Sequence, residues 1–164
     1  MSEPLVGSTG FEIGEALDAA AITQCRELFA EYQRGLGISL CFQQFDREMA
    51  NLPGDYARPR GRLVLARVAG EPAGCVALRP LGDDVAEMKR LYVRASCRGM
   101  GIGRTLAERV IDEARALGYR TVKLDTLPAM ADAQRLYREL GFADTPAYND
   151  NPVDGVRFLA LVLV

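Results

Sequence analysis

A glycine-rich turn near the middle of the chain is the segment whose residue types and spacing point most directly to chemistry. It reads Arg98-Gly99-Met100-Gly101-Ile102-Gly103 and runs into a helical pattern. Its three glycines permit positive φ angles and let a ligand approach the backbone without meeting a Cβ atom. The unpaired N–H groups and the positive dipole end of the following helix favour an anion. The turn therefore predicts a phosphate or pyrophosphate site, with Arg94, Arg98 and Arg104 around it as donors.

Two common nucleotide-binding motifs do not fit this turn. A G-x-G-x-x-G motif starting at Gly101 would need a third glycine where the chain has Leu106, and it would follow the first strand of a βαβ unit rather than lie in mid-chain. A Walker loop needs a Gly-Lys pair, which the sequence lacks. A turn that binds no ligand is the alternative that these residues alone leave open.

The remaining residue inventory excludes several catalytic chemistries. The chain has no histidine, and its four cysteines (Cys25, Cys41, Cys75 and Cys97) are far apart without a C-x-x-C pair. Zinc sites use clustered Cys and His ligands, so we expect no metal site. A Ser-His-Asp or Cys-His nucleophile is excluded for the same reason. Acid–base chemistry must then come from carboxylates, Tyr, Lys, Cys or water.

Length, composition and charge describe an ordinary globular chain. The 164 residues are 49% hydrophobic and 26% charged, which predicts one domain covering residues 1–164. A net charge of −2 gives no field for nucleic acid or an anionic membrane, so we expect neither as a partner. The longest apolar run is too short to span a bilayer, and the N-terminal residues lack the features of a signal peptide. We therefore expect a cytoplasmic protein.

Hydrophobic periodicity and turn residues predict a mixed sheet with helices on its faces, in the α/β or α+β class. The expected strands are Phe11–Ala16, Arg62–Val68, Gly74–Arg79, Val85–Val93, Thr121–Thr126, a strand starting at Phe142, and a buried one at Arg157–Val164. The expected helices follow Asp18 as N-cap to a stop at Gly35 and Gly37, and cover about Gln43–Asn51, Ile102–Leu117 and Ala131–Leu140.

The segment Arg98-x-x-Gly101-x-Gly103 resembles the acetyl-CoA-binding motif [RQ]-x-x-G-x-[GA] of the GNAT family of N-acetyltransferases. The surrounding residues are similar as well: Glu87–Val93 before the motif, Leu117-Gly118-Tyr119 after it, then Leu124-Asp125-Thr126 and Ala133-x-x-Leu136-Tyr137-x-x-Leu140-Gly141-Phe142. The resemblance covers about residues 62–164. It implies a single-domain, mostly antiparallel mixed sheet with splayed central strands and helices on both faces.

The resemblance implies acetyl-CoA as co-substrate and no metal. Its pantetheine arm would enter between two splayed strands, and backbone N–H groups of the turn would receive its pyrophosphate. The residues implied in cofactor binding are Leu91, Tyr92, Val93, Arg98, Gly99, Met100, Gly101, Ile102, Gly103 and Arg104. Many family members carry an asparagine at the position of Met130, and the neighbouring Asp132 is a candidate replacement.

The reaction implied is direct attack of a primary amine on the acetyl thioester in a ternary complex. Tyr137 matches the family tyrosine that protonates the departing thiolate; the alternative is a core aromatic on the stripe of Leu136 and Leu140. A phenol with a pKa near 10 can act as that acid.

Two carboxylates match positions of a general base in different branches of the family. Glu87 corresponds to the base of the histone acetyltransferase branch, and Asp125 to that of ribosomal-protein N-terminal acetyltransferases. Glu87 is the preferred base, and either carboxylate can act through a water. The alternative is a structural ion pair with Lys89, Lys123 or Arg90.

The acceptor is implied only as an amine of a small molecule or peptide, bound between loops at about residues 35–40 and 148–155. Asp150, Asp154, Glu48 and Asp55 favour a cationic amine, or are ordinary solvated acids. Two alternative functions stay open, a catalytically silent CoA-binding module and an acyltransferase for longer acyl-CoA. Homodimers are common in the family, and residues 157–164 are one candidate contact.

Overall fold

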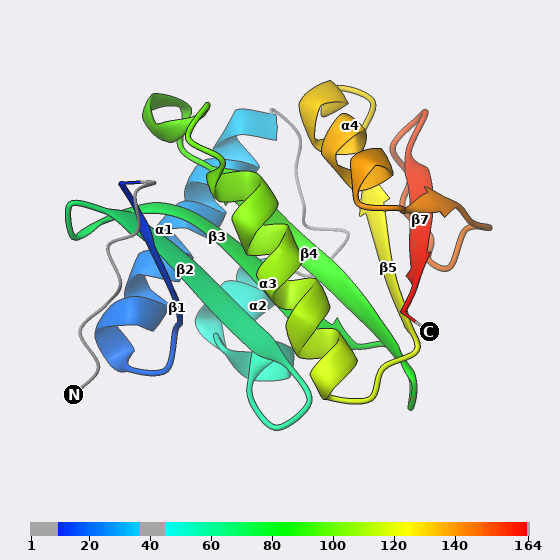
Figure 1. Cartoon of the computed structure of the whole chain (residues 1–164), viewed down its shortest axis with the longest axis horizontal. Helices are drawn as coiled ribbons and strands as arrows, with labels where there is room; N and C mark the ends of the chain where they lie inside the picture. The colour runs from blue at the N-terminus through cyan, green and yellow to red at the C-terminus, as the bar shows by residue number, and fades with distance from the viewer. Residues whose placement is uncertain (1–9, 37–44, 164) are drawn as a thin grey trace.

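The structure, a computed structural model, describes residues 10–36 and 45–163 of the chain. Within these residues, seven strands form one sheet with helices on both of its faces (Figure 1). The strands are β1 (Glu12–Glu15), β2 (Arg62–Val68), β3 (Glu71–Pro80), β4 (Val85–Val93), β5 (Thr121–Thr126), β6 (Ala143–Asp144) and β7 (Arg157–Val162). The helices are α1 (Ala19–Leu36), α2 (Phe45–Ala50), α3 (Ile102–Ala116) and α4 (Ala131–Glu139), with short 3₁₀ turns η2 (Gly54–Tyr56) and η3 (Ala95–Cys97).

The strand order is β1-β2-β3-β4-β5-β7-β6. Neighbouring strands run antiparallel, except that β4 and β5 are parallel and are joined through α3. This arrangement confirms the predicted mixed, mostly antiparallel sheet. None of the helices among the described residues is long and apolar enough to cross a membrane.

Each face of the sheet carries its own hydrophobic core. The stripe predicted on α3 is buried against one face through Ile102, Leu106, Val110 and Ala114. On the other face, α1 and α2 bury residues that include Leu28, Phe29 and Phe45. Figure 1 shows α3 in front of the sheet and α1 behind it. The central strands are therefore covered from both sides.

Most predicted element bounds agree with the structure, and the differences have local causes. Strand β3 begins at Glu71 rather than Gly74, because the hairpin turn needs only Ala69 and Gly70, both with positive φ. Gly35 lies inside α1, which continues to Leu36, while Gly37 and residues 43–44 lie outside the described residues. Strand β7 was expected to be buried, but only Leu159 on it is buried because β7 lies near the edge of the sheet.

Strands β4 and β5 pair over a short distance only. The parallel ladder joins Val85 to Thr121, Ala86 to Val122 and Glu87 to Lys123, and the register ends there. Beyond it, β5 continues along β7 and β4 continues along β3. The predicted splay of the central strands is therefore present, and it opens at the carboxyl ends of both strands.

A bulge in β4 lies directly beside this opening. The β3–β4 register passes from Ala77↔Lys89 to Cys75↔Tyr92, so β4 carries one residue more than β3 at this point. Arg90, one of the two residues that stand opposite Val76 here, has φ 61°, a left-handed value that non-glycine residues rarely adopt. The bulge changes the direction of the backbone where β4 turns away from β5.

Gly74 on β3 allows the backbone and α3 to pack closely at this end of the sheet. A Cβ atom on Gly74 would lie 2.8 Å from the carbonyl oxygen of Tyr92 and 3.2 Å from Leu106. We expect Gly74→Ala to lower the free energy of unfolding by about 1–3 kcal/mol, because backbone must shift to make room. Gly14 on β1 has nothing within 4 Å of such an atom, so Gly14→Ala is the matched control. Urea unfolding of both variants measures the difference, and equal stabilities would contradict the close packing at Gly74.

Candidate active site

A groove of about 580 Å³ runs along the end of β4, the glycine turn, the start of α3 and the start of α4. Most of the residues predicted to bind a cofactor line it: Leu91, Tyr92, Val93, Arg98, Gly99, Gly101, Ile102 and Gly103. Met100 and Arg104 are not among its lining residues. The side chain of Arg104 instead pairs with Glu139 on α4 and Glu108 on α3. The structure therefore brings the predicted turn and the predicted strand to one continuous surface.

The glycine turn has the geometry of an anion site at the start of α3. Gly99 has φ 86° and Gly101, the N-cap of α3, has φ 85°. The N–H of Thr105 donates to the carbonyl of Gly101 at 3.1 Å, so the preceding N–H groups of the first turn have no partner within the helix. Such groups and the helix dipole attract a phosphate.

Gly103 does not have the positive φ that the sequence suggested for it. It is helical, and a Cβ on it would lie 3.7 Å from Val93 Cγ2 and 3.9 Å from Leu136 Cδ2. Its missing side chain therefore keeps the groove open between β4 and α4.

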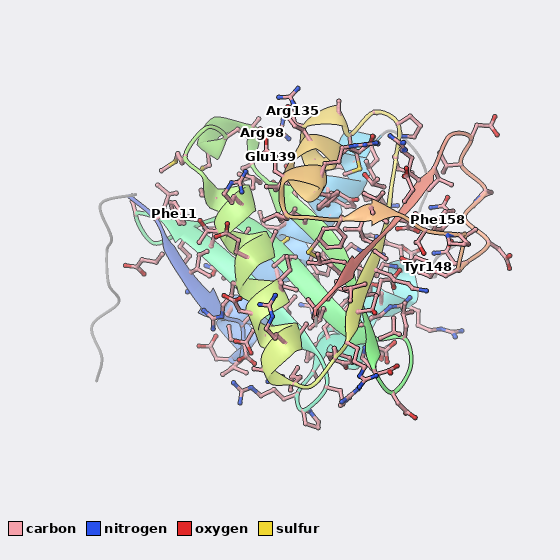
Figure 2. All side chains as sticks on the ribbon, turned by 45° about the vertical axis from the view of Figure 1, so that its right-hand side comes forward. Phe11, Arg98, Arg135, Glu139, Tyr148 and Phe158 are labelled. Atoms are coloured by element: carbon pink, nitrogen blue, oxygen red, sulfur yellow. The ribbon has the colours of Figure 1, made fainter. Side chains whose placement is uncertain are left out.

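Of the three arginines predicted around the turn, Arg98 alone lines the groove. Its Nε donates to the carbonyl of Val93 at 3.2 Å. Arg94 lies against α1, where its Nη2 is 2.6 Å from Glu31 Oε1. Figure 2 shows Arg98 and Glu139, the partner of Arg104, at the same end of the molecule. The local positive charge at the groove therefore comes mainly from Arg98 and the helix start.

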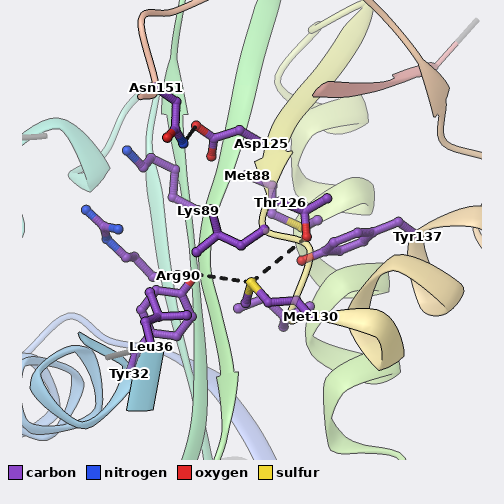
Figure 3. A pocket seen from close by; sticks show the side chains of 12 residues that line it. Tyr32, Leu36, Met88, Lys89, Arg90, Asp125, Thr126, Met130, Tyr137 and Asn151 are labelled. Atoms are coloured by element: carbon purple, nitrogen blue, oxygen red, sulfur yellow. Dashed lines mark hydrogen bonds between the residues drawn. The ribbon is translucent and has the colours of Figure 1, made fainter. Parts of the chain in front are cut away.

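A small pocket of about 30 Å³ adjoins the groove where β4 and β5 separate (Figure 3). Tyr32, Leu36, Leu91 and Met130 line both spaces, so the pocket lies directly beside the groove. Tyr137, Asp125, Lys89 and Asn151 also line the pocket. The structure therefore gathers a phenol and a carboxylate from separate elements, next to the end of the groove.

Tyr137 is held in the pocket wall by α4 and by the core. Its side chain is largely buried, with the residue 6% exposed, and its ring packs against Phe142 at 5.7 Å between centroids. Burial raises the pKa of Tyr137 far above that of a free phenol, and the nearby Tyr32 and Asp125 raise it further. A phenol is protonated at neutral pH with or without this shift, as a proton donor must be.

Asp125 on β5 is oriented by the loop between β6 and β7. Its Oδ2 accepts hydrogen bonds from Asn149 Nδ2 at 3.0 Å and from Asn151 Nδ2 at 3.2 Å. The Oδ1 of Asn151 accepts from the N–H of Val153 at 3.1 Å, which fixes the orientation of that amide. Two amide groups therefore hold one oxygen of Asp125, while the residue lines the pocket (Figure 3).

Glu87, the base preferred from the sequence, lies in a different environment. It is fully buried, and it lines neither the groove nor the small pocket. Its Oε1 accepts from Arg79 Nε at 2.7 Å, and its Oε2 accepts from the hydroxyl of Tyr148 at 2.6 Å. The ion pair expected as the alternative is present, but its partner is Arg79 rather than Lys89, Lys123 or Arg90.

The sequence profile of the acetyltransferase (GNAT) family matches residues 14–142. The chain belongs to the GNAT family. An uncharacterised N-acetyltransferase of Schizosaccharomyces pombe is 40% identical over 136 residues, which cover 82% of this chain and 83% of that protein.

Solved structures of GNAT proteins share this fold. An acetyltransferase from Streptococcus agalactiae matches with a TM-score of 0.78 and 22% identity, over 93% of this chain and 98% of that one. A putative acetyltransferase from Salmonella typhimurium, solved with its cofactor acetyl-CoA, matches with a TM-score of 0.66 and 20% identity, over 94% and 95% of the two chains. At these identities the likeness shows the fold.

Met130 is the residue at which the family resemblance implied an asparagine in many members. It precedes α4 and lies between the groove and the pocket. Its sulfur accepts from the hydroxyls of Tyr32 and Thr126, each at 3.9 Å (Figure 3). The neighbouring Asp132 lines the groove, but its side chain is 98% exposed and lies 3.9 Å from Arg135. Met130 therefore closes the junction with a thioether instead of an amide.

Several site residues were not found from the sequence. Tyr32 falls within the helix predicted after Asp18 and carried no further signal, yet it lines both spaces, and burial raises the pKa of Tyr32 to about 12. Arg79 could have been found from the hairpin register, since it stands directly opposite Glu87. Tyr148 carried no signal of its own, because its contact with Glu87 depends on how the loop folds.

The four acidic residues expected to attract a cationic amine either pair with arginines or are exposed to solvent. Glu48 is paired with Arg90, and Asp55 lies 3.8 Å from Arg79. Asp150 and Asp154 are exposed on the loop between β6 and β7, and most of the expected acceptor loop at 35–40 lies outside the described residues. Among residues 10–36 and 45–163, no cluster of three or more His, Cys, Asp or Glu could hold a metal ion.

Proposed function

We propose that this GNAT protein transfers the acetyl group of acetyl-CoA to a primary amine of a small molecule or peptide. One observation carries the proposal: a single groove joins the anion site at the start of α3 to the opening between β4 and β5, where Tyr137 and Asp125 line the adjoining pocket. The acetyl-CoA in the Salmonella structure of the same fold is consistent with this use of the groove.

The residues present suit the parts of acetyl-CoA. The free N–H groups at the start of α3 and the Arg98 side chain would receive the pyrophosphate. Leu91, Tyr92 and Val93 lie in the part of β4 that has no β5 partner. The backbone N–H and C=O groups on this open side of β4 can pair with the amides of a pantetheine arm. Gly103 leaves the space that a side chain would fill.

The proposed reaction is direct transfer between two bound substrates. The amine nitrogen attacks the thioester carbonyl carbon, a C–N bond forms, and the C–S bond breaks. Tyr137 donates its proton to the departing thiolate, since its buried phenol is protonated and lines the pocket. The amine must also lose a proton, because most amines are protonated at neutral pH.

Asp125 is the base that the geometry favours for this second proton. It lines the pocket with Tyr137, and two asparagines hold one of its oxygens. Glu87 is occupied by Arg79 and Tyr148 and lies outside the pocket. A pocket of about 30 Å³ has room for a bound water. We therefore propose that Asp125 accepts the proton, directly or through that water, and that Glu87 supports the sheet and the loop.

Two other functions compatible with the fold receive less support. A silent CoA-binding module would not need a buried phenol and an oriented carboxylate in one pocket beside the groove. The small pocket of about 30 Å³ next to Tyr137 gives no support for a longer acyl chain. Acetyl transfer accounts for both features.

The first prediction tests the anion site. Replacing Gly101 by Leu places a side chain at the start of α3, so we expect acetyl-CoA affinity to fall by tenfold or more, about 1.4 kcal/mol. Gly118 has φ 88° beyond the other end of α3, so Gly118→Leu introduces the same backbone strain away from the groove. Calorimetric titration compares the two variants with the parent protein. Equal affinities in all three would exclude the turn as the binding site.

The second prediction tests the proton donor. Tyr137→Phe keeps the ring that packs on Phe142 and removes only the hydroxyl, so we expect kcat to fall by about 100-fold or more while acetyl-CoA affinity changes little. Tyr119→Phe is the matched control, because its hydroxyl donates to Arg60 O at 2.8 Å beyond the other end of α3. Steady-state kinetics with an amine panel provide the readout. An unchanged kcat in Tyr137→Phe would assign Tyr137 to packing alone.

The third prediction separates the two carboxylates. Asp125→Asn retains an oxygen for the two asparagine donors but loses the base, so we expect a lower kcat with nearly unchanged stability. Glu87→Gln weakens a buried pair, so we expect the free energy of unfolding to fall by about 1–3 kcal/mol. Rates as a function of pH and urea unfolding of both variants measure these effects. The opposite pattern, with turnover lost in Glu87→Gln alone, would restore Glu87 as the base.

A further inference from the structure

The bulge in β4 places an arginine in an unfavourable backbone conformation beside the proposed site. Arg90 has φ 61°, and its side chain is only 3% exposed. A left-handed non-glycine residue persists only where its surroundings hold it there. A guanidinium buried to this extent also needs a charged or hydrogen-bonding partner.

Glu48 on α2 supplies such a partner. Its Oε2 accepts from Arg90 Nε at 3.0 Å and its Oε1 accepts from Arg90 Nη2 at 3.3 Å, a two-point contact that fixes the guanidinium plane. The hydroxyl of Tyr56 donates to the same Oε1 at 2.6 Å, and Phe45 lies with its ring 5.2 Å from the Arg90 guanidinium carbon. Residues of helix α2 and the turn η2 thus hold the side chain of the bulge residue Arg90 in place.

The backbone of the bulge is oriented as well. The carbonyl of Arg90 accepts a hydrogen bond from Cys75 Sγ at 3.4 Å. In a planar trans peptide, the N–H of the next residue points opposite to that carbonyl. The N–H of Leu91 is therefore directed away from Cys75, and Leu91 lines both the groove and the small pocket.

We propose that Glu48 is a positioning residue for acetyl transfer. It holds Arg90 in the left-handed conformation, and this conformation aims the Leu91 N–H as a donor toward the bound acyl group. This inference rests on the proposed function. Glu48 contacts neither of the proposed substrates, so it acts through Arg90 and the peptide that follows it.

A matched pair of substitutions separates positioning from stability. Glu48→Gln removes the charge facing Arg90. Glu113→Gln removes a charge at the same distance from Arg62, 3.0 Å between Glu113 Oε2 and Arg62 Nε, and this carboxylate also pairs with Arg109. The two pairs are similarly buried, with side-chain exposures of 3% and 16% for Arg90 and Glu48, and 9% and 20% for Arg62 and Glu113. Glu113 lies in the last turn of α3, at the opposite end from the anion site.

The first readout needs no ligand. In amide ¹H–¹⁵N spectra of the free protein, Glu48→Gln should shift the Leu91 and Tyr92 signals strongly, while Glu113→Gln should leave them in place. The second readout is kinetic and calorimetric. Glu48→Gln should weaken acetyl-CoA binding or lower kcat by about tenfold, whereas Glu113→Gln should change neither by more than about twofold. The two variants should lose similar amounts of free energy of unfolding.

Tyr56→Phe is the milder second variant, because it removes one hydrogen bond from Glu48 and keeps the ion pair. It should shift the same two amide signals by a smaller amount, and it serves the test if Glu48→Gln does not fold. Unmoved Leu91 and Tyr92 signals in the folded variants, or equal effects of Glu48→Gln and Glu113→Gln, would overturn the positioning role. Failure of the parent protein to bind acetyl-CoA would instead refute the proposed function, which the spectra of the free protein do not depend on.

Discussion

The separation of β4 from β5 is the constraint on which the rest of the site depends. Backbone N–H and C=O groups in a central strand are normally satisfied by both neighbours, and here the parallel ladder ends after the pair Glu87 and Lys123. The end of β4 therefore faces a space rather than a strand. An extended ligand with amides of its own can complete the pairing, as an added strand does. The groove follows this open edge and reaches the start of α3.

Strand β4 is covered on both faces and still carries two buried charged residues, Glu87 and Arg90. Both are tolerated because each has a partner of opposite charge from another element. Glu87 is paired with Arg79 and accepts from Tyr148, which connects β3 and the loop between β6 and β7 to the sheet. Arg90 is paired with Glu48 on α2. A buried charge without a partner is costly, so these contacts tie the segments on either side of the splay to the central strand.

Tyr137 and Asp125 show how the same fold gives two acid–base groups different surroundings. The phenol is enclosed by α4 and the core, and burial raises its pKa. The carboxylate lies near the end of β5, where Asn149 and Asn151 can reach it from a loop. One group is thus enclosed by apolar packing, while the other is held in place by two amide donors.

The sequence by itself determined most of the elements, the fold class and the glycine turn before α3, because these depend on local patterns. Apolar residues at helical spacing defined α3, and the glycines at its start defined a turn in which Gly99 and Gly101 have positive φ. The motif around Gly101 and the matching segments on both sides of it also sufficed to identify the GNAT family, which the family profile confirms. Tyr137 and Asp125 were named from the sequence, although their proposed roles stay predictions.

Only the tertiary structure decided which charged groups meet. Sequence spacing placed Glu87 and Asp125 on neighbouring strands but did not show that Arg79 and Tyr148 occupy the first while the second lines the pocket. Glu48 read as a free acid near the acceptor, whereas the fold places it against Arg90. The physical reason is that side-chain pairing across 42 residues depends on how helices and loops pack on the sheet, and periodicity along the chain carries no information on that packing.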